Sequence, residues 1–325
     1  MLKEKDKKNV KIAVVGAGPA GLAASKELLS YGFSVDIYEK EAFAGGVMAF
    51  GIPSFRFKMD AIAKQVEPVV ALGGNFKFNQ DLKESDFIRL AHEYDFVYLA
   101  FGLTKVRSLG IPGENLNGSL NALTFLREYN FAEKIKDGTS IPKLHGTVLV
   151  VGAGNVAMDA SRCAVRAGAE KTIIVYRRSE EEAPCTAIEL KQAREDGVTV
   201  DFLTNPVEVL GDEAGNVCGA KCEIMELSSP DESGRKKPVG TGKYKEYKCD
   251  YIISAIGQIP DNDIYDIKKI TTDHGYIKAI DGAYQTNIEN VYTGGDILLG
   301  AKTIGAALKC GKDFAKIVIS KYENE

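Results

Sequence analysis

Cysteine pairs, histidine and tryptophan are what this 325-residue sequence has least of. No two of its six cysteines have the C-x-x-C or C-x-x-x-x-C spacing of a redox dithiol, which excludes thioredoxin- and glutathione-reductase chemistry. Without tryptophan, the signature of Baeyer–Villiger-type monooxygenases is missing as well. Three scattered histidines, His92, His145 and His274, are interpreted as surface or structural residues. The sequence offers no cluster of metal ligands.

Long apolar runs are also missing. No stretch approaches the roughly 18 residues that cross a bilayer, and the first ten residues, MLKEKDKKNV, are too charged for a signal peptide. The net charge of −4 argues against a nucleic-acid or anionic-membrane surface. We therefore expect a cytoplasmic protein that binds neither nucleic acid nor a membrane. A length of 325 residues fits two domains.

Glycine, by contrast, is abundant, and it marks a duplication. Residues 11–41 and 147–179 both read as strand, glycine turn, helix and strand. Each is followed at a distance by an aspartate, a buried strand and a glycine, in residues 94–102 and 249–257. A further strand with glycines, NVYTGGD at residues 290–296, has no counterpart. Two similar units in one chain predict two domains of one kind.

This order predicts an α/β fold of two Rossmann-like dinucleotide-binding domains, one inserted within the other. The outer domain is expected to comprise residues 1–105 and 256–325, and the inserted domain residues 106–255. The polar stretch from Ser228 to Lys248 is interpreted as a hairpin of the inserted domain.

The first glycine loop, Gly16-x-Gly18-x-x-Gly21, follows a predicted strand at residues 12–15 and opens a helix. Such a loop lets backbone amides approach a pyrophosphate at the helix N-terminus. Glu39 ends the next strand, where a carboxylate accepts hydrogen bonds from an adenosine ribose and repels a 2′-phosphate. The loop therefore predicts an FAD site. The alternative is a helix-packing glycine triplet with a surface glutamate.

The second loop, Gly152-x-Gly154-x-x-Ala157, has the known alanine variant at its third position. Arg177 and Arg178 come at the end of the next strand, and a guanidinium pair can hold a 2′-phosphate. We expect this site to prefer NADPH to NADH. The alternative is that both arginines pair with the acidic run at residues 180–182.

With these motifs placed, the chain resembles the flavin/NADPH portion of the glutamate synthase small-subunit family. That family includes flavin domains of dihydropyrimidine dehydrogenase and of NADH-dependent ferredoxin–NADP oxidoreductase. The matching stretches run in order over nearly the whole chain: GAGPAGLA, GGVMAFGIPSFRF, GAGNVAMDASR, VYRRSEEEAP, AREDGV and NVYTGGDILLG.

The resemblance implies further cofactor contacts. Gly45, Gly46 and the segment FGIPSFR would lie along FAD, Asp296 would bind the ribityl chain, and a helix beginning near Thr303 would face the flavin. For Asp296 the alternative is a turn or capping residue. For the FGIPSFR segment, and for Phe55 and Phe57 in particular, the alternative is hydrophobic packing. The complete expected set is Gly16, Gly18, Pro19, Ala20, Gly21, Glu39, Lys40, Gly45, Gly46, Gly51, Ile52, Arg56, Gly102, Gly152, Gly154, Asn155, Val156, Ala157, Arg177, Arg178, Gly257, Gly295, Asp296 and Thr303.

The implied function is an FAD-dependent NADPH:acceptor oxidoreductase that passes electrons to a carrier or to an iron–sulfur partner subunit. No catalytic side chain is needed for hydride transfer between two cofactors. One departure is that only about ten residues, none of them cysteine, precede the first strand, so cluster-bearing cysteines of an N-terminal extension are not expected here. The alternatives are a free-standing ferredoxin–NADP reductase and a non-catalytic flavin- and nucleotide-binding scaffold subunit.

Overall fold

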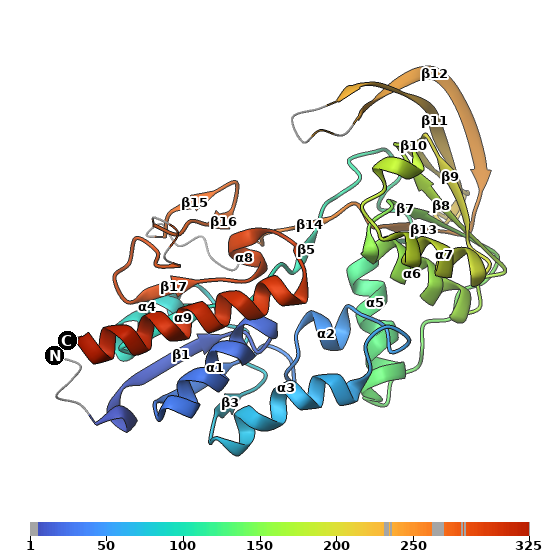
Figure 1. Ribbon diagram of the computed structural model, residues 1–325. Helices are drawn as coiled ribbons and strands as arrows, with labels where there is room; N and C mark the ends of the chain where they lie inside the picture. Colours follow the sequence, from blue (N-terminus) through green and yellow to red (C-terminus); the bar gives the residue numbers. More distant parts are fainter. Residues whose placement is uncertain are drawn as a thin grey trace. The chain divides into compact units, whose positions relative to one another are not determined.

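The computed structural model describes residues 6–230, 234, 236–261, 270–280, 282 and 284–324 (Figure 1). The chain forms two compact units. The first unit comprises residues 1–49, 57–105 and 258–325, and the second comprises residues 50–56 and 106–257. The long segment of the second unit lies close to the predicted limits of 106–255. The short segment at residues 50–56 is an addition that the sequence did not predict.

The first unit is built on a parallel sheet in the order β17-β4-β1-β2-β3. A long C-terminal helix, α9, packs along α1 on this unit (Figure 1). Its parallel strands are β1 (Lys11–Val15), β2 (Ser34–Tyr38), β3 (Asn75–Lys77), β4 (Phe96–Leu99) and β17 (Val291–Thr293). Its helices are η2 (Lys7–Asn9), α1 (Pro19–Tyr31), α3 (Met59–Ala71), α4 (Glu84–Glu93), α8 (Asp296–Leu299) and α9 (Ile304–Asn324), with α2 (Val47–Phe50) ending at the unit boundary.

The second unit repeats this plan with the order β6-β13-β7-β8-β9, again parallel. Its strands are β6 (Ser119–Asn121), β7 (Thr147–Val151), β8 (Lys171–Tyr176), β9 (Thr199–Phe202) and β13 (Tyr251–Ser254). Its helices are α5 (Ala122–Asn130), the π-helical turn η3 (Phe131–Ile135), α6 (Asn155–Arg166), η4 (Glu180–Glu182) and α7 (Ala187–Glu195). The two sheets confirm the predicted pair of Rossmann-like folds.

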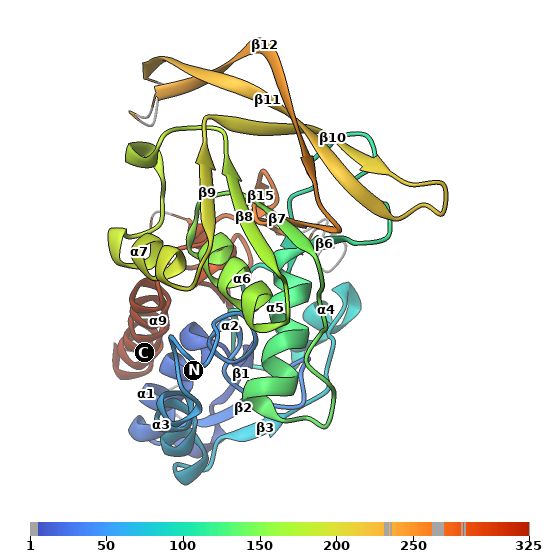
Figure 2. The same cartoon turned by 90° about the vertical axis from the view of Figure 1, so that its right-hand side faces the viewer.

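A three-stranded antiparallel sheet of β10 (Thr204–Gly211), β11 (Val217–Pro230) and β12 (Lys236–Lys248) extends the second unit (Figure 2). The predicted hairpin at residues 228–248 contains the end of β11 and all of β12, although Asp231, Glu232, Ser233 and Arg235 lie outside the described residues. Two short ladders are also present in the described ranges: β5 (Lys105–Val106) with β14 (Gln258–Ile259), and β15 (Thr272–Asp273) with β16 (Tyr276–Ile277).

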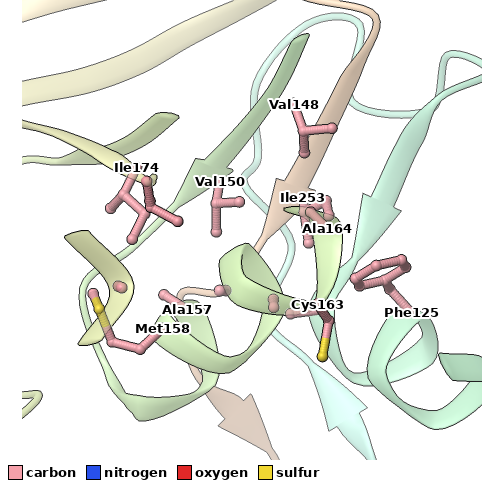
Figure 3. Close-up of a cluster of buried hydrophobic side chains, with 14 of the residues drawn as sticks. Phe125, Val148, Val150, Ala157, Met158, Cys163, Ala164, Ile174 and Ile253 are labelled. Atoms are coloured by element: carbon pink, nitrogen blue, oxygen red, sulfur yellow. The ribbon is translucent and has the colours of Figure 1, made fainter. Parts of the chain in front are cut away.

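One of the two hydrophobic clusters of the second unit lies between its parallel sheet and helices α5 and α6 (Figure 3). Val148 and Val150 from β7 meet Cys163 and Ala164 from α6, and Phe125 from α5 closes the cluster. All five side chains are at most 2% exposed. Burying such a face holds α6 on the sheet and therefore fixes the glycine loop that precedes it.

In both units an aspartate forms two hydrogen bonds to the first residue of the strand that precedes the glycine loop. Asp95 donates its N–H to the Lys11 carbonyl at 2.9 Å and accepts the Lys11 N–H on its carboxylate at 2.9 Å. Asp250 does the same with Thr147, at 2.8 Å in each direction. The aspartates noted in the sequence before each exit strand therefore tie the start of that strand to the start of the strand before the glycine loop.

Candidate dinucleotide sites

The first glycine loop is held tightly against strand β4. Gly16 has φ +102°, and a Cβ on it would lie 2.6 Å from the Ala100 carbonyl oxygen. Its N–H donates to the Tyr38 carbonyl at 2.8 Å. Helix α1 comes next, with Pro19 at its first position, so the N–H groups of Ala20 and Gly21 point out of the first turn without helical partners. A Cβ on Gly21 would lie 1.9 Å from the Gly16 carbonyl, so helix and loop make direct backbone contact.

Glu39 is turned towards this loop. Its carboxylate accepts the Ala17 N–H at 2.8 Å and the Glu41 N–H at 3.0 Å, and the residue is 6% exposed. Burial raises the pKa of the Glu39 carboxyl, and the two amide bonds oppose that shift. The alternative of a surface glutamate is wrong. A carboxylate fixed beside the loop and still holding free lone pairs suits ribose hydroxyl groups.

Gly45 and Gly46 complete the edge of the first loop. The Gly45 N–H donates to the Ala17 carbonyl at 2.8 Å, and a Cβ on Gly46 would lie 2.8 Å from the Gly18 Cα. Lys40, beside Glu39, is exposed. These expected FAD contacts therefore gather around one loop of the first unit.

At the carboxyl end of the first unit's sheet, Gly295 lies beside the start of helix α1, since a Cβ on it would be 3.1 Å from the Ala20 Cβ. Gly295 precedes Asp296, the first residue of helix α8. Burial raises the pKa of the Asp296 carboxyl. Within the described ranges, this carboxyl accepts a single long bond of 3.4 Å, from the Lys302 N–H. Helix α9 begins at Ile304, one residue after the expected start, and Thr303 Oγ1 accepts the Ala306 N–H at 3.2 Å. Asp296 thus keeps capacity for a ligand, and Thr303 has a capping role.

The second glycine loop has nearly the same backbone conformation and hydrogen bonds as the first. Gly152 has φ +122°, a Cβ on it would lie 2.5 Å from the Ala255 carbonyl, and its N–H donates to the Val175 carbonyl at 3.0 Å. Asn155 and Val156 begin helix α6, and Ala157 is fully buried. The exit-strand glycines also match: Gly102 has φ +71° and Gly257 φ +112°, with open space where a Cβ would be.

Arg177 and Arg178 differ in their surroundings. Arg177 is exposed, and its guanidinium makes no ion pair or hydrogen bond within the described residues. Arg178 is 6% exposed, and its Nε donates to the Lys236 carbonyl at 2.9 Å. Neither arginine pairs with the acidic run, because Glu180 pairs with Arg194, Glu181 with Lys236, and Glu182 with the Ser179 hydroxyl. Within the described residues, the alternative that both arginines pair with residues 180–182 is therefore wrong.

The segment at residues 50–56, expected along FAD, bonds to the second unit, of which it is part. Asn130 Nδ2 donates to the Phe50 carbonyl at 2.8 Å, and Lys134 Nζ donates to the Ile52 carbonyl at 2.9 Å. Phe55 lies under the guanidinium groups of Arg162 and Arg166, with ring-centroid distances of 4.2 and 4.4 Å. The FAD contacts of Gly51, Ile52 and Arg56 stay a prediction.

Arg56 ends this segment in an ion cluster that the sequence did not reveal. Its guanidinium binds Asp159 of α6 at 2.6 Å and also Glu189 of α7, two carboxylates with 4% and 9% side-chain exposure. Burial raises the pKa of Asp159 to about 6, against the lowering effect of Arg56. Glu189 also accepts the N–H of Thr186, and the neighbouring Cys185 N–H donates to the Ala153 carbonyl in the glycine loop at 3.1 Å. The single acid inside the helical pattern NVAMDAS, Asp159, was the available signal.

Other chemistries find no support in the described ranges. Nowhere among them do three or more His, Cys, Asp or Glu side chains group as metal ligands. All six cysteines are free, and four of them are buried. None of the helices in the described ranges has the length and apolar character that a membrane crossing requires.

Two parallel sheets of the same topology, each with a glycine loop that leads into a helix, define a protein with two Rossmann-like dinucleotide-binding folds. The glycine cradles, the buried Glu39 and the exposed Arg177 fit two adenine dinucleotides. Comparison with known proteins gives the family. The chain belongs to the pyridine nucleotide-disulphide oxidoreductases, whose family model matches residues 10–311, and it is an NAD(P)-dependent flavin oxidoreductase.

Named relatives support the glutamate synthase resemblance. The chain is 38% identical over 317 residues to the NADP(+)-dependent formate dehydrogenase subunit beta of Moorella thermoacetica, covering 96% of this chain and 44% of that protein. It is 31% identical to the glutamate synthase [NADPH] small chain of Escherichia coli, covering 96% of this chain and 69% of that protein. The chain spans half or less of the length of several relatives, including that formate dehydrogenase subunit.

Solved structures share the fold. FprA from Mycobacterium tuberculosis, in a complex with NADPH, matches with a TM-score of 0.80 at 23% identity, covering 97% of this chain and 85% of that one. Thioredoxin reductase from Lactococcus lactis matches with a TM-score of 0.72 at 19% identity, covering 98% and 100%. At these identities the likeness concerns the fold alone.

Proposed function

We propose that this chain is an NADPH:acceptor oxidoreductase in which FAD binds the first unit and NADPH binds the second. The observation that carries the proposal is the contrast after the second strand of each unit. A buried carboxylate, Glu39, bonds the first loop, whereas an exposed guanidinium without an internal partner among the described residues, Arg177, lies beyond the second. The first suits ribose hydroxyl groups and disfavours a phosphate, and the second suits the 2′-phosphate of NADPH.

The chain's own residues would bind and orient the two cofactors. In the first unit, the amides of Ala20 and Gly21 would donate hydrogen bonds to the pyrophosphate of FAD. Glu39 would bind the adenosine ribose, and Asp296 would bind the ribityl chain. In the second unit, the first amides of α6 would bind the pyrophosphate of NADPH, and Arg177 would bind its 2′-phosphate. The bound flavin would supply the redox chemistry, since it accepts a hydride and can release electrons singly or in pairs.

The electron acceptor is proposed to be a carrier or a partner subunit that holds iron–sulfur clusters. The names of two relatives support a multi-subunit setting: a formate dehydrogenase subunit beta, and the NADPH-Fe(3+) oxidoreductase subunit beta of Geobacter sulfurreducens, which is 34% identical over 346 residues. A free-standing ferredoxin–NADP reductase would use the same first half-reaction with a soluble acceptor.

The test is an anaerobic stopped-flow experiment with the FAD-loaded protein. NADPH and NADH are mixed in separately, and bleaching of the oxidised flavin is followed at about 450 nm. We expect rapid bleaching by NADPH and slower bleaching by NADH. Arg177→Ala should raise the NADPH concentration for half-maximal rate about tenfold and leave NADH nearly unchanged, because a charge-assisted contact contributes on the order of 1.4 kcal/mol.

Lys243→Ala is the matched control, because it removes one exposed positive charge from β12 of the same unit. It should behave like the wild type. If Arg177→Ala slows both nucleotides equally, the 2′-phosphate assignment is wrong. If neither nucleotide bleaches a fully loaded protein, the oxidoreductase proposal fails and the scaffold subunit replaces it.

A further inference from the structure

We infer that Lys236, at the start of β12, provides the second positive charge of the 2′-phosphate site, and that Arg178 is a positioning residue that holds Lys236 there. This inference rests on the proposed function, since it concerns the same NADPH site. It changes the composition of the site from the sequence-based pair, Arg177 with Arg178, to Arg177 with Lys236.

Arg178 is poorly placed to serve a ligand. It is 6% exposed, although it directly follows the exposed Arg177. Its Nε donates to the Lys236 carbonyl at 2.9 Å, a bond between residues 58 positions apart. A direct phosphate ligand needs a guanidinium edge open to solvent. Arg178 instead ties the first residue of β12 to the loop after β8.

The Lys236 side chain is available at the same loop. Its Nζ lies 3.8 Å from a Glu181 carboxylate oxygen, with side-chain exposures of 51% for Lys236 and 80% for Glu181. A long ion pair between two exposed side chains is weak. The ammonium group can therefore leave Glu181 for a phosphate at little cost, because a phosphate carries more charge than a carboxylate.

The fold explains why this loop is the right place. In a Rossmann-like unit the adenosine ribose lies beyond the carboxyl end of the second strand, which here is β8, ending at Tyr176. Residues 177–181 form the stretch after that end, and Lys236 is bonded to it through its carbonyl and paired with it through its amine. The long β11–β12 hairpin thus delivers a residue that is remote in sequence to the predicted 2′-phosphate position.

The experiment compares adenosine 2′,5′-bisphosphate with 5′-AMP, which lacks the 2′-phosphate, by isothermal titration calorimetry on the FAD-loaded chain. Lys236→Ala should weaken binding of the bisphosphate about tenfold and change 5′-AMP by less than about twofold. Lys236→Arg should restore most of the loss. Lys243→Ala, on the same strand, should match the wild type.

Arg178→Lys separates positioning from direct binding, because it keeps the charge and removes the Nε donor. A positioning role predicts a loss as large as that of Lys236→Ala, and no added loss in the double variant. A direct role predicts that Arg178→Lys retains most of the affinity, and this result would overturn the positioning assignment. Wild-type affinity in Lys236→Ala, with a loss in Arg177→Ala, would overturn the Lys236 inference alone. A wild type that does not distinguish the two nucleotides would instead overturn the NADPH proposal.

Discussion

The two dinucleotide units share their glycine loops and differ in the residues just beyond the second strand. Register pairs Val15 with Tyr38 in the first unit and Val151 with Val175 in the second. By that register, Glu39 corresponds to Tyr176, which is buried and donates its hydroxyl to the Glu182 carbonyl at 2.9 Å. The arginines come one and two positions later. Under the proposed assignment, a few residues on a common backbone would set the choice of nucleotide.

A second difference is the short segment that the second unit receives from an earlier part of the chain. Residues 50–56 are anchored there by a charged cluster, two backbone carbonyls and an aromatic ring between arginines. The first unit contains no such segment in the ranges that the structure describes. The second unit's nucleotide loop thus depends on a distant residue, because Arg56 binds Glu189, which in turn caps α7 at Thr186 beside Cys185.

The largest expected effect tests the third motif position of the two loops, which is glycine in the first unit and alanine in the second. Gly21→Ala places a methyl group 1.9 Å from the Gly16 carbonyl, so helix α1 must move and FAD should be lost. Ala157→Gly, at the matching position, should cost only about 1 kcal/mol of helix stability and keep NADPH binding. The flavin-to-protein absorbance ratio of the purified variants measures the first effect. Lys26→Ala is the control, since Lys26 is an exposed residue of the same helix; full FAD content in Gly21→Ala would contradict the prediction.

The next effect concerns the added segment. Arg56→Met leaves Asp159 and Glu189 buried without their cation and should lower the free energy of unfolding by about 3 kcal/mol. Arg89→Met removes a more exposed pair with Glu93 and Asp86 on α4 of the first unit and should cost below about 1 kcal/mol. Urea unfolding measures both. Hydrogen exchange should rise in α6 and α7 for Arg56→Met alone. An equal decrease in the free energy of unfolding of both variants would show that the buried cluster stabilises the protein no more than the exposed pair.

A smaller effect depends on pH. Burial lowers the pKa of Lys134 to about 8, so between pH 8 and 10.5 the unfolded chain binds more protons at this residue than the folded one. The free energy of unfolding therefore rises with pH over that window. The gain from Lys134 is lost again as the pH falls through about 8. Lys134→Met should remove a gain of about 2 kcal/mol between pH 8 and 10. Urea unfolding at both values checks it, with the exposed Lys143→Met as control; an unchanged pH slope would contradict the assignment.

The repeated parts were predictable from the sequence because each is a local pattern with a steric cause. The glycine loops require φ values of +102° and +122°, and the helix after Thr303 shows its own periodicity. The Arg56 cluster and the Arg178–Lys236 bond were not predictable in this way. They join residues 103, 133 and 58 positions apart, and nothing in the local pattern of either partner indicates the other.

The smallest expected effect tests where the units should not differ. Asp95 and Asp250 clamp Lys11 and Thr147 with the same two bonds, so Asp95→Ala and Asp250→Ala should each cost about 1 kcal/mol, the typical net value of one lost hydrogen bond. The remaining backbone bond is kept in both variants, which limits the loss. Hydrogen exchange at β1 and β7 reports each unit separately. Equal increases in hydrogen exchange at the two strands would support the same structural role for both aspartates. A stability loss several times larger in one unit would show that its aspartate has a further role.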